Sequence, residues 1–180
     1  VLIGMENCVE LTIEGLYNVD NLNITMVNNR ILRKLSLSSH NAIFNRQAMK
    51  NVNEFISDKL TYISIADTII VDIDNLNVSK ANQIETLNFT RARISRLNNI
   101  SLHGLKSLKH LILSYNSIQS ISDFNMNGVE LLESIDLSYN FISLLIIRAI
   151  NSLNSLRLVN LEGNQIRTLD MIMFKHLRSI

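Results

Sequence analysis

A spacing of 24 residues runs through the second half of the chain and constrains its fold more than any other feature. Three segments follow one pattern without gaps, with apolar residues at the first, fourth and sixth positions and an asparagine at the ninth. They begin at Leu108, Leu132 and Leu156, and their asparagines are Asn116, Asn140 and Asn164. The alternation within each segment predicts a short strand with one buried face. Because one segment cannot bury that face alone, the spacing predicts stacked parallel strands, one per repeat.

The same apolar columns extend towards the N-terminus, although less regularly. Earlier strand segments centre on Leu11, Leu35, Ile63 and Leu87, which makes seven in all. Leu35 and Ile63 are 28 residues apart instead of 24, so we expect an irregular, longer return at 41–59. The whole chain, 1–180, is then one repeat domain.

The pattern L-x-x-L-x-L-x-x-N-x-L resembles the leucine-rich repeat family. The resemblance implies an α/β solenoid of about seven repeats, a horseshoe with a parallel concave β-sheet and an irregular, 3₁₀ or short-helical convex side. The copy length and the L-S-Y-N stretches at 113–116 and 137–140 resemble the animal extracellular type, as in insect Toll-like and innate-immune proteins. Extracellular members usually carry cysteine-rich caps, whereas Cys8 is the only cysteine and Ile180 opens a further repeat. We therefore expect a fragment that lacks both caps.

The asparagines stand where the chain turns out of each strand. There an inward amide can bond to backbone groups of its own and the next repeat, which predicts a structural asparagine ladder at Asn116, Asn140 and Asn164. In the earlier copies the same position holds Leu16, His40, Thr68 and Ala92. Ala92 has no group that can form these bonds, so the N-terminal half is expected to be the looser half.

Several classes of function have no support in the sequence. The formal net charge of +1 gives no electrostatic case for nucleic acid or for an anionic membrane, and no apolar run approaches the roughly 18 residues of a membrane span. Hydrolase, metalloprotease and phosphate-loop motifs are absent. Cys8 is interpreted as a small buried apolar residue and His40 as a substitute hydrogen-bonding residue of the ladder. No catalytic residue, cofactor or metal site is predicted.

Four tripeptides fit the N-glycosylation pattern N-x-[ST]. They begin at Asn23, Asn77, Asn88 and Asn99. Together with the resemblance they favour a secreted or cell-surface protein. The alternative is a cytosolic scaffold or regulator in which these tripeptides are accidental.

The outward strand positions of the last repeats define a candidate partner-binding face. Tyr115 and Tyr139 share one column, so strand spacing places them about 4.8 Å apart. With their neighbours they form a mixed aromatic and polar patch, typical of protein interfaces. The alternative is that the tyrosines only pack against each other. The predicted partner-binding residues are His110, Ile112, Tyr115, Asp136, Tyr139, Leu158 and Asn160. The expected partner is a protein ligand or co-receptor.

Two further groups are weaker candidates. A surplus apolar cluster after the sixth strand predicts a homo- or heterodimer contact, which would make the chain a self-associating adhesion module; the alternative is local burial or packing under further sequence. This cluster comprises Phe141, Leu144, Ile146 and Ile147. A basic group across one repeat is interpreted as a solvated flank rather than a site for sulfated glycans, and comprises Arg91, Arg93, Arg96, Lys106 and Lys109.

Overall fold

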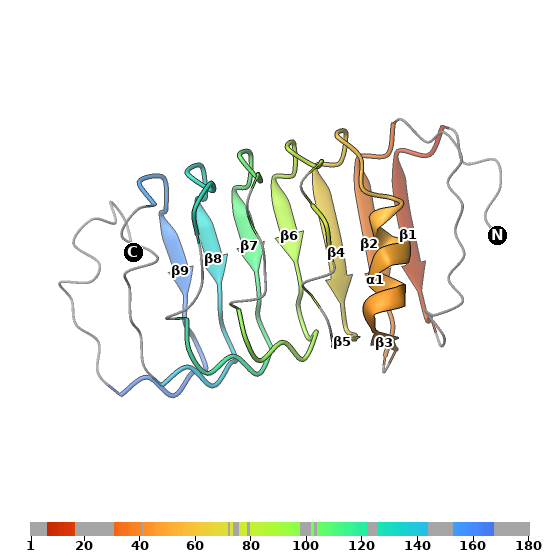
Figure 1. Cartoon of the computed structure of the whole chain (residues 1–180). Helices are drawn as coiled ribbons and strands as arrows, with labels where there is room; N and C mark the ends of the chain where they lie inside the picture. Colours follow the sequence, from red (N-terminus) through yellow and green to blue (C-terminus); the bar gives the residue numbers. More distant parts are fainter. Residues whose placement is uncertain are drawn as a thin grey trace.

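The computed structural model describes residues 7–16, 31–40, 42–71, 73, 76–78, 80–97, 102, 104–121, 126–143 and 153–167. These residues form a parallel seven-stranded sheet in the order β1-β2-β4-β6-β7-β8-β9, so neighbours in the chain are neighbours in the sheet (Figure 1). The strands are β1 Glu10–Glu14, β2 Lys34–Ser38, β4 Tyr62–Ala66, β6 Thr86–Asn88, β7 His110–Ile112, β8 Ser134–Asp136 and β9 Leu158–Asn160. The predicted solenoid with seven strand segments is confirmed.

The strand register confirms the repeat columns. Leu35 pairs with Ile63 across the 28-residue step, and Leu87 pairs with Leu111 across a 24-residue step. Side chains in this central column point into the core, where the hydrophobic effect stabilises the stack. The column is buried from Leu11 to Ile135, and Val159 packs against the core while only partly buried.

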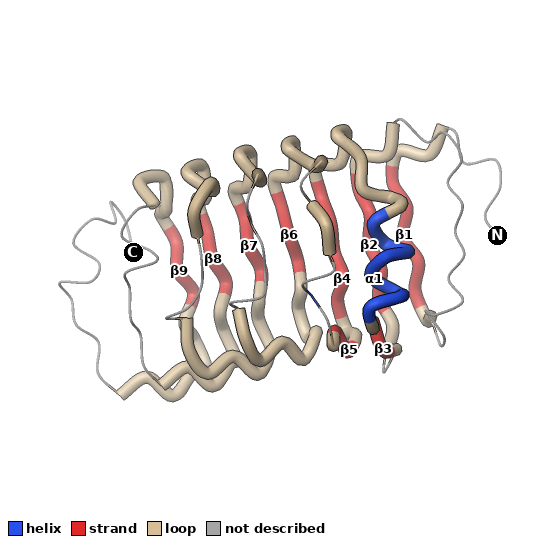
Figure 2. Tube along the Cα trace, viewed as in Figure 1, coloured by secondary structure: helices blue, strands red, loops and turns tan. Residues whose placement is uncertain are grey.

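The sequence predicts an irregular return at 41–59. This prediction is only partly correct, because the return contains helix α1, Arg46–Asn53. The Asn45 side chain caps this helix by accepting hydrogen bonds from the N–H groups of Gln47 and Ala48, at 2.9 and 3.0 Å. Its spacing places Ala48, Met49 and Val52 on one buried face. Figure 2 shows α1 on the return side of the first strands.

A second, two-stranded parallel sheet accompanies this helix. Strand β3, Ile43–Phe44, pairs with β5, Ile69–Ile70. The N–H groups of Ile69 and Val71 donate to the carbonyls of Ala42 and Phe44, at 2.9 and 3.1 Å. Backbone bonds of this kind also join the later returns, where the Phe141 and Gln165 N–H groups donate to the carbonyls of Ile118 and Ile142 at 2.9 Å. In the N-terminal repeats they join the returns without an asparagine.

The asparagine ladder is present in the last repeats. The Asn140 Nδ2 atom donates to the carbonyls of Leu113, Leu137 and Ser138 at 2.9, 3.0 and 3.2 Å, and its Oδ1 accepts from the Ile118 N–H at 2.9 Å. Asn116 and Asn164 bond in the same way.

The other residues at the ladder position behave differently. The interpretation of His40 as a substitute hydrogen-bonding residue of the ladder is wrong, because His40 is exposed and forms no hydrogen bond with the described residues. Thr68 is buried, and its hydroxyl has no hydrogen-bond partner. Ala92 is buried as well. Its carbonyl accepts from the Ile70 N–H at 3.0 Å, in the place where the Asn116 Oδ1 accepts from the Ile94 N–H one repeat later.

Candidate functional site

One turn follows the strands and repeats along the sheet with a left-handed backbone. Non-glycine residues seldom adopt this conformation, and it places their side chains in a row on the outside of the turn. The N–H groups of Asp67, Arg91, Tyr115 and Tyr139 each donate to a carbonyl of the next repeat. The left-handed residues of this column are Gly15 (φ 69°), Asp67 (54°), Arg91 (52°), Tyr115 (57°), Tyr139 (54°) and Gly163 (68°).

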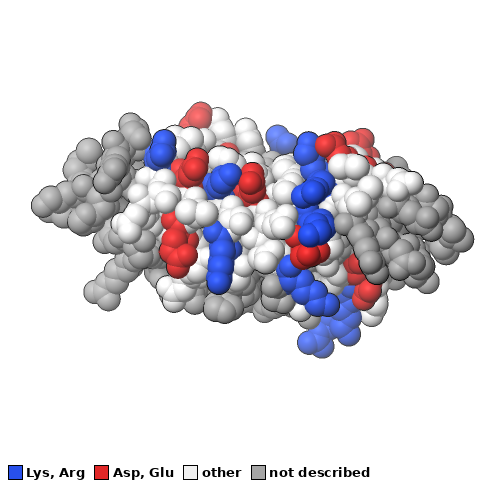
Figure 3. Space-filling model, turned by 90° about the horizontal axis from the view of Figure 1, so that it is seen from above, with Lys and Arg blue, Asp and Glu red and all other residues white. Residues whose placement is uncertain are grey.

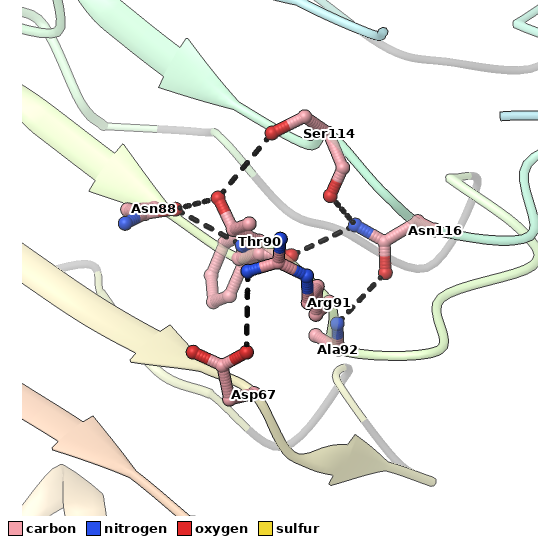
Figure 4. A network of polar contacts seen from close by, with 8 residues as sticks. Asp67, Asn88, Thr90, Arg91, Ala92, Ser114 and Asn116 are labelled. Atoms are coloured by element: carbon pink, nitrogen blue, oxygen red, sulfur yellow. Dashed lines mark hydrogen bonds and ion pairs between the residues drawn. The ribbon is translucent and has the colours of Figure 1, made fainter. Parts of the chain in front are cut away.

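The side chains of this row form a continuous stack. The Arg91 guanidinium forms an ion pair with the Asp67 carboxylate (dashed line in Figure 4), at a distance of 3.5 Å, and lies 4.5 Å from the centre of the Tyr115 ring. The Tyr115 and Tyr139 rings stack with centroids 4.4 Å apart and planes 10° from parallel. These contacts confirm that the two tyrosines are neighbours and extend their row to Asp67. We call Asp67, Arg91, Tyr115 and Tyr139 the turn stack.

The C-terminal end of the stack is fixed by the next repeat. The Tyr139 hydroxyl donates to the Glu162 carboxylate at 2.7 Å. This hydrogen bond, with the nearby negative charge of Glu162, raises the pKa of Tyr139 above its ordinary value of 10.0. A Cβ atom on Gly163 would lie 2.6 Å from the Tyr139 ring, so only glycine leaves room for the ring there.

The other predicted partner-binding residues lie beside the stack on β7, β8 and β9. His110 Nδ1 lies 2.8 Å from the Ser134 hydroxyl, Ile112 is half-buried, and Leu158 is 56% exposed. Of this group, Leu158 offers the largest free apolar surface.

Asp136 and Asn160 have a structural role that the sequence analysis missed. The Asp136 carboxylate accepts from the N–H and the hydroxyl of Ser138, at 2.9 and 2.7 Å. The Asn160 Oδ1 accepts from the Glu162 N–H at 3.1 Å. Both side chains thus close the turn that leads into the stack, and Asp or Asn at the last strand position is a readable signal for such turns.

An open surface pocket of about 490 Å³ lies at the N-terminal end of the stack. We call it the seam pocket, because it lies where the β3–β5 pairing gives way to the asparagine ladder. Its lining residues are His40, Asp67, Thr68, Ile69, Arg91, Arg93 and Tyr115. The sequence placed Arg91 and Arg93 in one repeat, but nothing in the repeat pattern placed His40 opposite them across the 28-residue step.

The basic group does not converge on one surface. Arg91 and Arg93 line the seam pocket, whereas Lys109 pairs with Glu85 at 3.1 Å where the strands begin. Figure 3 views the molecule from that strand-entry side and shows basic and acidic side chains interspersed. The interpretation of Lys109 as part of a charged flank fits this arrangement.

The candidate glycosylation sites are partly described. Asn77 is exposed, and Asn88 lies half-buried on β6, where its Oδ1 accepts from the N–H and hydroxyl of Thr90 at 3.0 and 2.6 Å. Asn23 and Asn99 lie outside the described residues.

The remaining predicted residues are the apolar cluster and Cys8. In the apolar cluster, Phe141 is 50% exposed, and Leu144, Ile146 and Ile147 lie outside the described residues. Cys8 is half-buried against the core. Within the described ranges, no group of three metal-binding side chains occurs. The same part of the chain has no helix with the length and apolar character of a membrane span.

Comparison with known proteins agrees with this geometry. The leucine rich repeat family model matches residues 58–118 and 106–166, which together exceed half of the chain. No curated protein shows a significant match.

Solved structures share the fold at low sequence identity. The Toll–Spatzle complex of Drosophila, in its glycosylated form, matches with a TM-score of 0.65 and 17% identity, over 86% of this chain and 21% of that one. The TLR13–ssRNA13 complex matches with a TM-score of 0.61 and 18% identity, over 85% and 26%. Internalin InlF of Listeria monocytogenes matches with a TM-score of 0.51 and 20% identity, over 85% and 47%. The chain thus spans between a fifth and a half of these proteins.

Proposed function

Because the chain belongs to the leucine-rich repeat family, we propose that it is a non-catalytic recognition module that binds a partner protein with the concave face of its sheet. Proteins of this family are generally non-catalytic. The observation that carries the proposal is the pair of stacked tyrosines, which are 44% and 41% exposed although they are held in place by their neighbours. Rigid, exposed aromatic side chains are frequent anchors of protein interfaces.

A protein partner fits the charge distribution better than a nucleic acid. Nucleic-acid binding needs several cations free to neutralise phosphates. Here the formal net charge is only +1, and three of the cations, Lys34, Arg91 and Lys109, are paired with a carboxylate of a neighbouring repeat. Spatzle in one similar structure is a protein, and ssRNA13 in another is an RNA, so the binding test includes both classes.

The binding experiment compares two variants of the concave face. Partners are captured from extracellular fluid of the source organism, identified, purified and titrated against the chain by calorimetry. The double substitution Tyr115→Ala and Tyr139→Ala should weaken binding by about 30-fold, which corresponds to about 2 kcal/mol. Tyr62→Ala is the matched control, because Tyr62 lies on β4 away from the stacked pair. An unchanged affinity of the double variant contradicts the proposal, as does binding of only a single-stranded RNA.

The proposal places the protein outside the cell or on its surface, as a glycoprotein receptor or innate-immune component. Its support is Asn77 within an N-x-[ST] tripeptide, because this residue is exposed and N-linked glycans are attached at the protein surface. Expression in a secretory host followed by glycosidase treatment should increase the electrophoretic mobility, and Asn77→Gln should remove part of that shift. The absence of any shift supports the cytosolic scaffold or regulator instead.

Self-association is a second candidate function, favoured by the exposed Phe141. Replacing Ile146 and Ile147 by Asp should convert a dimer into a monomer in light scattering. If the wild-type chain is already monomeric at high concentration, or the variant keeps its size, the adhesion module is excluded.

A further inference from the structure

The seam pocket lies where the hydrogen bonding of the return segments changes. On its N-terminal side the Ile70 N–H donates to the Ala92 carbonyl at 3.0 Å, next to the β3–β5 pairs. On its C-terminal side the Ser117 N–H donates to the Ile94 carbonyl at 2.8 Å, and the Ile94 N–H donates to Asn116. Arg93 stands between these two patterns.

The backbone of Arg93 has a left-handed φ of 55°, in addition to that of Arg91. The equivalent residues one repeat before and one repeat after, Ile69 and Ser117, do not share this conformation. Such a conformation is strained in a non-glycine residue and frequently marks a functional position. Here it brings a second guanidinium to the pocket.

The pocket carries one uncompensated positive charge. Asp67 neutralises Arg91, and none of the ion pairs among the described residues involves Arg93, whose side chain is exposed. A guanidinium whose donors are free binds a carboxylate through two parallel hydrogen bonds.

The remaining walls are suited to a peptide. Ile69 and the Tyr115 ring provide an apolar and an aromatic surface. A volume of about 490 Å³ is within the range of about 300–1,000 Å³ found for small-ligand pockets. It accommodates one acidic side chain with an apolar neighbour. A sulfated polysaccharide needs several unpaired cations in a row, which this pocket does not offer.

We propose that the seam pocket binds an acidic side chain of a partner polypeptide, with Arg93 pairing the carboxylate and Ile69 and Tyr115 holding the adjacent apolar residue. This inference rests on the proposed function, because it assumes a protein partner. It adds a charged specificity site at the N-terminal end of the turn stack, next to Tyr115, whereas Tyr139 does not line the pocket.

The test uses two peptides that differ only in charge. The probe is acetyl-Gly-Ile-Glu-Ile-Glu-Gly-amide, and its control carries Gln in place of both Glu residues. Each is titrated into the ¹⁵N-labelled chain, and the arginine Nε–Hε signals are followed by NMR. The acidic peptide should shift the Arg93 signal, and the Gln peptide should bind at least about tenfold more weakly, because it lacks the carboxylate.

Matched variants locate the site. Arg93→Gln should weaken binding of the acidic peptide at least about tenfold, while Arg96→Gln, an exposed arginine of the same repeat that does not line the pocket, should change it less than about twofold. Circular dichroism melting of both variants verifies that they remain folded. Equal binding of both peptides, no binding of the acidic peptide, or equal losses in the two variants each overturns the proposal.

Two further titrations separate this proposal from the others. Tyr139→Ala should leave the peptide affinity within about threefold while it weakens the natural partner. If the partner binds and the acidic peptide does not, the seam pocket proposal fails and the proposed function stands. A heparin oligosaccharide that shifts the Arg93 and Arg96 signals equally, with no response to the peptide, identifies a diffuse basic surface and overturns the proposal.

Discussion

The N-terminal and C-terminal halves of the sheet satisfy the same backbone requirement in different ways. Around β1, β2 and β4, the strands are five residues long and the returns are joined by the β3–β5 ladder and helix α1. Around β6 to β9, the strands are three residues long, and side-chain amides of Asn116, Asn140 and Asn164 bond the returns. A repeat can therefore lose its asparagine where a backbone carbonyl, such as that of Ala92, accepts the bond from the return.

The largest expected effect is the loss of a ladder asparagine. Asn140→Ala should reduce the free energy of unfolding by about 3 kcal/mol, because it leaves several buried backbone groups without partners. The control Asn154→Ala removes an exposed amide and should change stability by less than about 0.5 kcal/mol. Urea denaturation measures both. If Asn140→Ala lowers the free energy of unfolding by less than about 1 kcal/mol, the asparagine ladder does not make the expected contribution to stability.

A smaller effect is expected at the cap of α1 in the N-terminal half. Asn45→Ala should cost about 1 kcal/mol, because the N–H groups of Gln47 and Ala48 lose their acceptor. Asn45→Ser keeps an acceptor at the cap and should restore most of the loss in the same denaturation experiment. If both variants are equally destabilised, the cap is not the cause.

At Thr68 the expected change has the opposite sign. Thr68→Val removes a buried hydroxyl that has no partner and keeps the shape of the side chain, so it should raise stability by up to about 1 kcal/mol. Thr90→Val is the contrasting variant, because the Thr90 hydroxyl bonds to Asn88 and its loss should destabilise. Thermal melting compares the two, and a lower melting temperature for Thr68→Val refutes the assignment.

The smallest effect concerns the turn stack. Its hydrogen bond to Glu162 raises the pKa of Tyr139 above 10.0, so this bond stabilises the fold below pH 10 and the contribution is lost as the pH rises through the higher, folded value. Glu162→Gln should bring the titration of Tyr139 back towards 10.0, and Glu133→Gln should leave it unchanged. NMR of ¹³Cζ-labelled tyrosine follows the titration. A Tyr139 pKa that does not respond to Glu162→Gln shows that the cause lies elsewhere.

Periodicity predicted the regular part of the molecule well, because one pattern repeated at 24 residues leaves few ways to bury the apolar columns. It placed Tyr115 beside Tyr139 for the same reason. Helix α1 was missed because the longer return has no second copy for comparison. The seam pocket was missed because it brings His40 together with residues of later repeats across the 28-residue step. The interpretation of His40 as a hydrogen-bonding residue of the ladder was wrong, because His40 is exposed and lines the seam pocket instead.

The sequence and the structure lead to different expectations for the backbone dynamics of the two halves. The sequence predicts a looser N-terminal half, because Ala92 and the earlier residues at the ladder position are not asparagines. The β3–β5 ladder and its buried helix favour comparable order, because the return amides of both halves have backbone or amide acceptors. Slow amide exchange distinguishes these expectations, since it reports the free energy of local opening.

The most direct measurement is native-state hydrogen exchange of four amides. Those of Ile69 and Val71 donate within the β3–β5 ladder, and those of Ile118 and Ile142 donate to ladder asparagines. If the β3–β5 pairing holds its returns as firmly as the asparagine ladder holds the later ones, the protection factors of the two pairs of amides agree within about tenfold. This corresponds to about 1.4 kcal/mol of opening free energy. Exchange of Ile69 and Val71 that is more than about 100-fold faster would show that the N-terminal half is held by weaker pairing and would contradict the account.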